Sequence, residues 1–195
     1  MIGLDFNVQH TDGLEGLKTV PESSTALVIA DCGQAMAPDW ADEVMRILKP
    51  SGYLCVCSTY MGSTAFSHIG NYVSRRFIVV GGFEAKDTVV GTAMWLVFQV
   101  SPWPRPPWQG VRWLKYGFPK NQLGNSQRST LNMIGIVVLL TKAGDLVVDV
   151  CAGWGTVAIA CHRVGCRYLG FEEDRKRTNE ANLRLQGRWP REATC

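Results

Sequence analysis

The chain has 195 residues, of which 46% are hydrophobic, and a formal net charge of +3 at pH 7. This length is typical of one domain, and the apolar share is enough for a substantial core, which excludes an intrinsically disordered chain. No apolar run approaches the roughly 18 residues that a membrane span needs, and the N-terminus lacks the basic and apolar regions of a secretion signal. We therefore expect a soluble intracellular protein of the cytoplasm, nucleoid or nucleus.

The first half of the chain alternates strand and helix patterns. Apolar and polar residues alternate from residue 2 to residue 8, which is typical of a half-buried strand, and residues 25–30 form a continuous apolar run, which is typical of a strand buried on both faces. Helices are predicted at 14–17 and from Pro38 to the stop at Lys49-Pro-Ser-Gly52. Further strands are predicted at 53–58, 77–80 and 92–100, the last two as an antiparallel hairpin at the sheet edge.

A basic, irregular segment separates the two halves. Residues 101–125 carry five prolines and three tryptophans, and no Asp or Glu occurs from Thr88 to Gly144, where six Lys and Arg residues lie. A structureless segment of this length is usually functional, and aromatic rings among basic residues suit stacking and phosphate contact on nucleic acid. The alternatives are an ordinary solvated basic loop and tryptophans that pack the loop onto the sheet. The candidate nucleic-acid-binding residues are Arg105, Trp108, Arg112, Lys115 and Lys120.

The second half contains a strand, a glycine loop, a helix, a second strand and an acid in succession. The predicted elements are helices at 126–141 and 156–163 and strands at 146–150 and 167–171. Asp149 lies at the end of the first strand, and Glu172 ends the second strand 23 residues later. This order places an acid beside the ribose hydroxyls in nucleotide sites. A cofactor that carries a nucleoside is therefore expected.

The seven cysteines are odd in number and contain no C-x-x-C pair. Several fall in apolar strands or helices, where a free thiol behaves as a small hydrophobic group. We therefore expect neither a disulfide framework nor a zinc site.

The glycine segment resembles a specific family signature. Asp149-Val-Cys-Ala-Gly-Trp-Gly-Thr156 is similar to the D-x-F-x-G-S-G-T signature of S-adenosylmethionine-dependent methyltransferases that modify adenine N6 or cytosine N4 in DNA. Other segments of that family are matched by Arg46–Gly52, Gln127–Leu131, Gly170–Glu172 and Ala181–Leu185. A dinucleotide-binding domain is the alternative, but the third glycine of its G-x-G-x-x-G pattern is absent. The order of the matched segments resembles the permuted class of the family, in which the catalytic segment precedes the cofactor segment.

The resemblance implies a fold for the whole chain. It implies one doubly wound α/β domain with a mostly parallel, seven-stranded Rossmann-like sheet, whose N-terminal strand lies beyond strand 167–171 at the sheet edge. Within this single domain, 1–195, the resemblance implies a catalytic-motif half at 1–100, a short recognition-like loop at 101–125 and a cofactor-binding half at 126–195.

The resemblance also implies a cofactor, S-adenosylmethionine. The glycine loop would line its methionine end, and Glu172 would hold its ribose. Trp154 departs from the family pattern, because it stands where the family has a small serine. The implied cofactor-binding residues are Asp149, Ala152, Gly153, Gly155, Thr156 and Glu172.

The segment at the family's catalytic position is Asp31-Cys32-Gly33-Gln34, where the family has [D/N/S]-P-P-[Y/F/W]. In the family the polar side chain and a backbone carbonyl hold the exocyclic amine of a flipped base, the prolines fix the backbone, and the aromatic ring stacks on the base. Only the acid matches, so Asp31 is the implied catalytic residue. Stacking would have to come from Trp40 or Tyr60. A buried thiol is favoured over a nucleophile as the role of Cys32.

Two functions stay open at this point. The first is methyl transfer to an exocyclic amine of DNA, at adenine N6 or cytosine N4, which the cofactor block and Asp31 favour. The second is a catalytically inactive methyltransferase-fold protein that binds nucleic acid or a protein partner, which the missing prolines and aromatic ring favour. DNA is preferred to RNA through the resemblance alone. A homodimer or a second methyltransferase-like subunit would add the selectivity that a short recognition loop lacks.

Overall fold

The secondary structure follows the predicted alternation of strands and helices. The computed structural model describes residues 6–31, 38–58, 77–87, 91–100, 112–116 and 130–187. The strands are β1 (Asn7–His10), β2 (Thr25–Ala30), β3 (Leu48–Ser58), β4 (Phe77–Asp87), β5 (Gly91–Val100), β6 (Arg112–Tyr116), β7 (Leu146–Asp149) and β8 (Arg167–Glu172). The helices are α1 (Gly13–Thr19), α2 (Pro38–Ile47), α4 (Thr130–Leu140), α5 (Thr156–Val164) and α6 (Arg175–Leu185).

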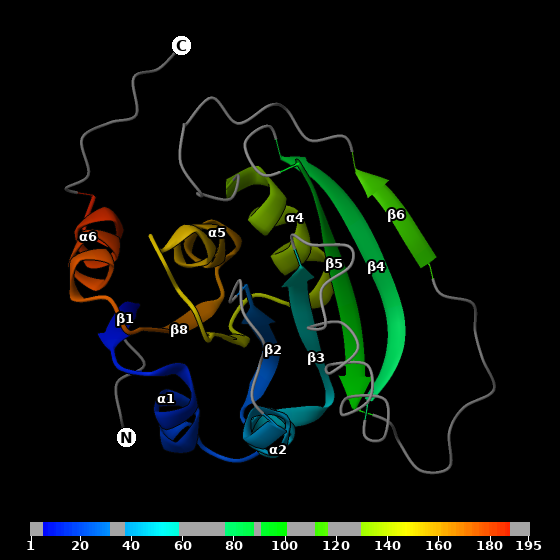
Figure 1. Cartoon of the computed structure of the whole chain (residues 1–195), viewed down its shortest axis with the longest axis horizontal. Helices are drawn as coiled ribbons and strands as arrows, with labels where there is room; N and C mark the ends of the chain where they lie inside the picture. Colours follow the sequence, from blue (N-terminus) through cyan, green and yellow to red (C-terminus); the bar gives the residue numbers. More distant parts are fainter. Residues whose placement is uncertain are drawn as a thin grey trace.

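All the described strands belong to one sheet, in the order β1-β8-β7-β2-β3-β5-β4-β6 (Figure 1). The first five strands in this order, β1, β8, β7, β2 and β3, pair in parallel. The β3–β5 and β5–β4 pairs are antiparallel, and the β4–β6 pair is parallel. The predicted α/β class with a mostly parallel sheet is thus confirmed, and β1 lies beyond β8 at the edge.

The predicted number of seven strands is wrong, because the described residues form eight. The additional strand, β6, lies inside the segment 101–125 that the sequence predicts to be irregular. Its residues Arg-Trp-Leu-Lys-Tyr contain no proline and include two aromatic residues with high strand propensity. The prolines around this short run hide it in the sequence. Because β6 pairs with the outer side of β4, the hairpin of β4 and β5 is not the sheet edge.

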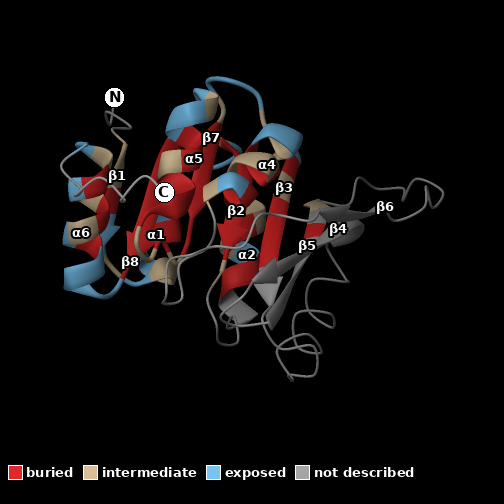
Figure 2. Cartoon of the chain, turned by 90° about the horizontal axis from the view of Figure 1, so that it is seen from above, coloured by how far each residue is buried: buried red, intermediate tan, exposed pale blue. Residues whose placement is uncertain are grey.

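Helices cover both faces of the sheet (Figure 1). On one face α4, α5 and α6 pack on alternate residues of the parallel strands, such as Val147 and Ile29, and on the other face α1 and α2 pack on Val148 and Val28. The strands β2 and β7 are buried along their whole length, as the red ribbon in Figure 2 shows. Their continuous apolar runs are therefore explained by burial on both faces. Among the residues that the structure describes, no helix combines the length and apolarity that crossing a bilayer requires.

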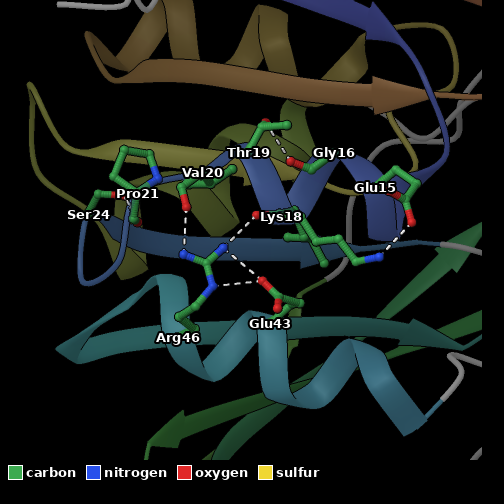
Figure 3. Close-up of polar contacts among 10 residues, drawn as sticks. Glu15, Gly16, Lys18, Thr19, Val20, Pro21, Ser24, Glu43 and Arg46 are labelled. Carbon is green, nitrogen blue, oxygen red and sulfur yellow. Dashed lines mark hydrogen bonds and ion pairs between the residues drawn. The ribbon is translucent and has the colours of Figure 1, made fainter.

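One arginine joins the two helices of the α1/α2 face. Arg46, near the end of α2, donates to the carbonyl oxygens of Leu17 at 2.9 Å and Val20 at 2.8 Å, and it pairs with Glu43 at 2.7 Å (Figure 3). The carbonyls at a helix C-terminus lack partners within the helix. Arg46 therefore satisfies the end of α1 while it holds α2 against that helix.

The outer strand β1 is held by a side chain of α6. The amide of Asn182 donates to the carbonyl oxygen of Val8 at 2.8 Å and accepts from its N–H at 2.8 Å. Because both backbone groups of Val8 face away from β8, this side chain takes the position of a further strand.

Candidate cofactor and catalytic site

Three acids lie at one edge of the sheet. Asp149 ends β7 and Glu172 ends β8, while Asp31 directly follows β2. These strands are parallel neighbours, and Asp149 pairs with Ile29 on one side and with Gly170 on the other. The carboxyl ends of the strands therefore coincide, at the edge where open α/β sheets bind ligands.

Glu172 is buried and fastens the loop that follows β7. Its Oε2 accepts a hydrogen bond from the N–H of Gly153 at 2.8 Å, and its Oε1 accepts one from the N–H of Asp174 at 2.9 Å. Arg177 adds a longer contact, with its NH1 3.9 Å from Oε1. Each carboxylate oxygen has two acceptor positions. The two bonds therefore leave further capacity on both oxygens for hydroxyl donors.

The glycine loop between β7 and α5 has the backbone that its sequence predicts. Gly153 and Gly155 have φ values of +52° and +75°, which a side chain would strain. A Cβ at Gly155 would lie 3.0 Å from the Cβ of Ala181, so this glycine also lets α6 approach the loop. A Cβ at Gly153 would meet no atom closer than 3.9 Å, the carbonyl oxygen of Cys151. The loop is thus closely packed at Gly155 and open at Gly153.

The flanking residues of the loop are buried, as befits a cofactor segment. The N–H of Ala152 donates to the carbonyl of Phe171 at 2.8 Å, which continues the β7–β8 contact into the loop. Thr156 begins α5 and is 8% exposed. The structure therefore brings together all six of the predicted cofactor-binding residues around the ends of β7 and β8.

Arg184 supports the same loop and was not predicted from the sequence. It lies on α6, is buried, and donates from NH1 to the carbonyl oxygen of Trp154 at 2.6 Å. Trp154 is half-buried, and this bond fixes the backbone at the position where the family has a serine. The only signal in the sequence is an arginine within the matched segment Ala181–Leu185, which is weak because arginine stems often cover apolar surface.

Asp149 is the most buried of the three acids, with 1% of its surface exposed. Its Oδ2 accepts a hydrogen bond from the Tyr168 hydroxyl at 3.1 Å, whereas its Oδ1 has no hydrogen bond of standard geometry. Burial raises the pKa of Asp149 to about 7. The Tyr168 hydroxyl and the Cys151 N–H lower that pKa, while the charges of Asp31 and Glu172 raise it. Asp149 therefore changes charge near neutral pH.

Asp31 is half-buried and lies near the same acids. Burial raises the pKa of the Cys55 thiol in β3, and the charge of Asp31 raises that pKa further. Because β2 pairs with β3 on one side and with β7 on the other, Asp31 lies between the ends of these two strands. Cys32, Gly33, Gln34 and Tyr60 lie outside the described residues.

Trp40 does not supply the stacking face considered from the sequence. Its side chain is 9% exposed and belongs to the core between α1 and α2. One atom of its indole would lie 3.2 Å from a Cβ at Gly13, so the ring packs against the start of α1. The apolar face of α2 explains this position, because Trp40 is on the same side as Val44 and Ile47.

The cysteines differ in state. Cys55, Cys161 and Cys166 are buried free thiols, as expected for small hydrophobic side chains. Cys151 is disulfide-bonded, which the cysteine spacing does not predict. Within the described ranges, no group of His, Cys, Asp and Glu has the arrangement of a metal site.

The predicted nucleic-acid-binding residues fall in two groups. Arg112 and Lys115 belong to β6, which corrects their assignment to an irregular loop. Arg105, Trp108 and Lys120 lie outside the part of the chain that the structure describes.

Solved structures share this architecture over almost the whole chain. M1.HpyAVI in complex with SAM superposes with a TM-score of 0.73 at 19% identity, over 92% of this chain and 99% of that one. A putative DNA modification methylase from Thermus thermophilus, TTHA0409, complexed with S-adenosyl-L-methionine, gives 0.75 at 19% identity, over 95% of each chain. The PvuII DNA methyltransferase, specific for cytosine N4, gives 0.71 at 16% identity, over 96% of this chain and 87% of that one. The chain has the fold of a DNA methyltransferase.

This likeness is one of structure. No protein-family model matches the sequence, and no curated protein does. The structural likeness nevertheless extends over 92% to 96% of this chain.

Proposed function

We propose that this protein is an S-adenosylmethionine-dependent DNA methyltransferase that modifies an exocyclic amine, adenine N6 or cytosine N4. The observation that carries the proposal is the set of three acids at one sheet edge, with the glycine loop fastened to Glu172. The likeness to methyltransferases over more than nine-tenths of the chain supports it.

The side chains at the edge fit this cofactor chemically. Asp149 Oδ1 is a buried acceptor without a hydrogen bond of standard geometry, and an ammonium group is a strong donor for it. Glu172 keeps acceptor capacity for ribose hydroxyls beside the backbone bonds it already makes. S-adenosylmethionine carries an ammonium group, a sulfonium and a ribose, and when bound it supplies an electrophilic methyl group. An acidic edge suits a ligand with this positive charge.

The chain's own residues would then divide the work. Asp149, with the glycine loop, would hold the methionine end, and Glu172 would hold the ribose. Asp31 would accept a hydrogen bond from the exocyclic amine of the base and keep its nitrogen facing the methyl donor. Such orientation is the main source of rate in a transfer between two bound groups.

Nucleic acid would be held by the basic segment. Arg105, Trp108, Arg112, Lys115 and Lys120 are our candidates, because cations contact phosphates and tryptophan stacks on an extruded base. DNA is preferred to RNA because the solved neighbours include a DNA modification methylase and a DNA methyltransferase.

The deciding experiment measures transfer of labelled methyl from S-adenosylmethionine to DNA and to RNA, followed by nucleoside analysis. We expect label on adenine N6 or cytosine N4 of DNA. Asp31→Ala should lower the rate on the order of 100-fold or more, because it removes the group that orients the amine. Glu22→Ala is the matched control, since Glu22 is an exposed acid in the turn before β2.

The result also separates the alternatives. Cofactor binding without transfer would replace the enzyme by a catalytically inactive protein of the same fold. Transfer that is unchanged in Asp31→Ala would leave the enzyme but reject the role of Asp31. Label found in RNA alone would correct the substrate.

A further inference from the structure

Tyr168 is a fully buried tyrosine whose hydroxyl has one described partner, the acid at the end of the neighbouring strand. It lies in β8, and its hydroxyl donates to Asp149 Oδ2 at 3.1 Å. A buried tyrosine hydroxyl normally needs a partner, but a phenylalanine would fill the same apolar space without one. The hydroxyl is therefore the feature that needs an explanation beyond packing.

Gly170 makes this contact possible. It pairs directly with Asp149 across the β7–β8 ladder, so a side chain there would lie beside the carboxylate. A Cβ at Gly170 would overlap the Tyr168 hydroxyl, and it would lie 2.8 Å from the ring carbon that bears the hydroxyl. The phenol thus extends along β8 into the space that Gly170 leaves, and reaches the acid opposite.

The phenol itself is held in place by packing. The ring of Phe6 stacks on that of Tyr168, with centroids 6.4 Å apart and an interplanar angle of 19°. Burial raises the pKa of Tyr168 well above its usual value. The hydroxyl is therefore protonated, and remains a donor, throughout the neutral range.

We propose that Tyr168 is a positioning residue of the cofactor site: its hydroxyl holds Oδ2 of Asp149 in one orientation and so leaves Oδ1 as the acceptor for the ligand's ammonium group. This inference rests on the proposed function, because it gives the methionine end of the cofactor as the partner of Asp149. It adds a residue that binds no ligand itself but decides how a binding residue acts.

If Tyr168 positions Asp149, its removal should change the pH dependence of ligand binding, which a residue that only packs would not do. The groups that act on Asp149 are Asp31 after β2, the Cys151 N–H after β7, and Tyr168 and Glu172 of β8. Asp149 in turn raises the pKa of the Cys161 thiol of α5. The Tyr168 hydroxyl lowers the pKa of Asp149 by donating to its charged form. Without the hydroxyl, Asp149 should need a higher pH to ionise, and an ammonium ligand should bind only at that higher pH.

The test is calorimetric binding of S-adenosylhomocysteine, from pH 6 to pH 8.5, by the wild type and by Tyr168→Phe. The wild type should bind more tightly as the pH rises through about 7. In Tyr168→Phe this rise should move to higher pH. At pH 7 the variant should bind roughly tenfold more weakly than the wild type, in the range of one hydrogen bond to a charged group. At pH 8.5 the difference in affinity should narrow to less than about threefold. Tyr53→Phe is the matched control, because Tyr53 is half-buried within β3.

A second measurement keeps the proposal testable if Tyr168→Phe does not fold. Replacing all tyrosines biosynthetically by 3-fluorotyrosine makes each phenol a more acidic and stronger donor. The rise in affinity should then move to lower pH in the otherwise unchanged protein.

The outcomes are distinct. An equal loss of affinity at every pH in Tyr168→Phe, or a pH profile that the fluorinated phenol leaves in place, would show that Tyr168 only packs. Binding by the variant that equals the wild type would likewise overturn this inference and leave the proposed function standing. Absence of binding by the wild type at every pH would overturn both.

Discussion

The ends of β7 and β8 carry acids that the fold treats in opposite ways. Glu172, at the end of β8, accepts hydrogen bonds from two backbone N–H groups. Asp149, at the end of β7, is more deeply buried; its Oδ2 accepts from the Tyr168 hydroxyl, and its Oδ1 has no hydrogen bond of standard geometry. Of these two neighbouring acids, Glu172 therefore stabilises the glycine loop, whereas Asp149 is in surroundings that disfavour its negative charge.

The difference teaches which part of the site is built in advance. The Glu172 carboxylate has both of its backbone donors before any ligand arrives. Asp149 Oδ1 has no hydrogen bond of standard geometry, so a cationic ligand at this atom would offset part of the cost of burying the acid. We therefore infer that the ribose end is preformed and that the ammonium end is completed by the ligand.

The largest expected loss of stability comes from replacing Glu172, whose backbone hydrogen bonds form before any ligand binds. Glu172→Ala removes both acceptors of the Gly153 and Asp174 N–H groups, so we expect a loss of about 3 kcal/mol in the free energy of unfolding, since each bond to a charged group contributes about 1.5–3 kcal/mol. Binding of S-adenosylhomocysteine should weaken tenfold or more. Denaturant unfolding and calorimetry measure the two effects. Glu173→Ala is the control, because Glu173 is the exposed neighbour; unchanged binding in Glu172→Ala would remove Glu172 from the site.

A second variant separates stability from binding. Arg46→Ala breaks the bonds to Leu17, Val20 and Glu43 on the opposite face of the sheet. We expect the free energy of unfolding to fall by about 2 kcal/mol, because the substitution removes the hydrogen bonds of the guanidinium to the carbonyls of Leu17 and Val20 and to Glu43. Affinity for S-adenosylhomocysteine should stay within about twofold. Lys18→Ala removes an exposed ion pair with Glu15 and should cost less than about 0.5 kcal/mol. A tenfold loss of affinity in Arg46→Ala would mean that the cofactor site responds to general destabilisation.

An effect of the opposite sign is expected at Asp149, at the end of β7. The pKa of Asp149 is raised to about 7 in the folded protein. The stability that this group contributes is therefore fully present below the pKa of an aspartate in the unfolded chain, and it is lost as the pH rises from that pKa through about 7. Asp149→Asn removes that loss and still accepts from Tyr168. We expect the ligand-free variant to be more stable than the wild type at pH 8 by as much as several kcal/mol, since each unit of pKa shift corresponds to about 1.4 kcal/mol. The difference should disappear towards pH 4.

Thermal unfolding of the ligand-free proteins across pH measures this difference. Acids that do not interact with Asp149 titrate alike in both proteins, so their contributions cancel. Affinity for S-adenosylhomocysteine should meanwhile fall about tenfold, as an unpaired ammonium group requires. A variant that is less stable than the wild type at pH 8 would contradict a raised pKa at Asp149.

The sequence predicts best the parts whose pattern is local. Residues 25–30 form β2 with the predicted bounds, because a short apolar run between turn residues leaves few alternatives. The glycine loop was likewise predictable, since Gly153 and Gly155 take the positive φ values that favour glycine. The positions of Asp149 and Glu172 followed from the ends of their strands.

What the sequence did not show depends on contacts between distant residues. The Tyr168–Asp149 pair needs the register of β7 against β8, and the Arg184–Trp154 bond joins residues on α6 and on the loop. Neither relation leaves a periodic pattern. The strand β6 was missed for another reason, because its five residues are too few to stand out among the neighbouring prolines.

The amide of Asn182 also affects how this protein meets other chains. An exposed edge strand offers unpaired N–H and C=O groups to which a strand of another molecule can add. At Val8 both of these groups are already bonded to the Asn182 side chain. Strand addition at this point of β1 would first have to break two hydrogen bonds within the molecule, so α6 protects this edge of the sheet from self-association and amyloid-like growth.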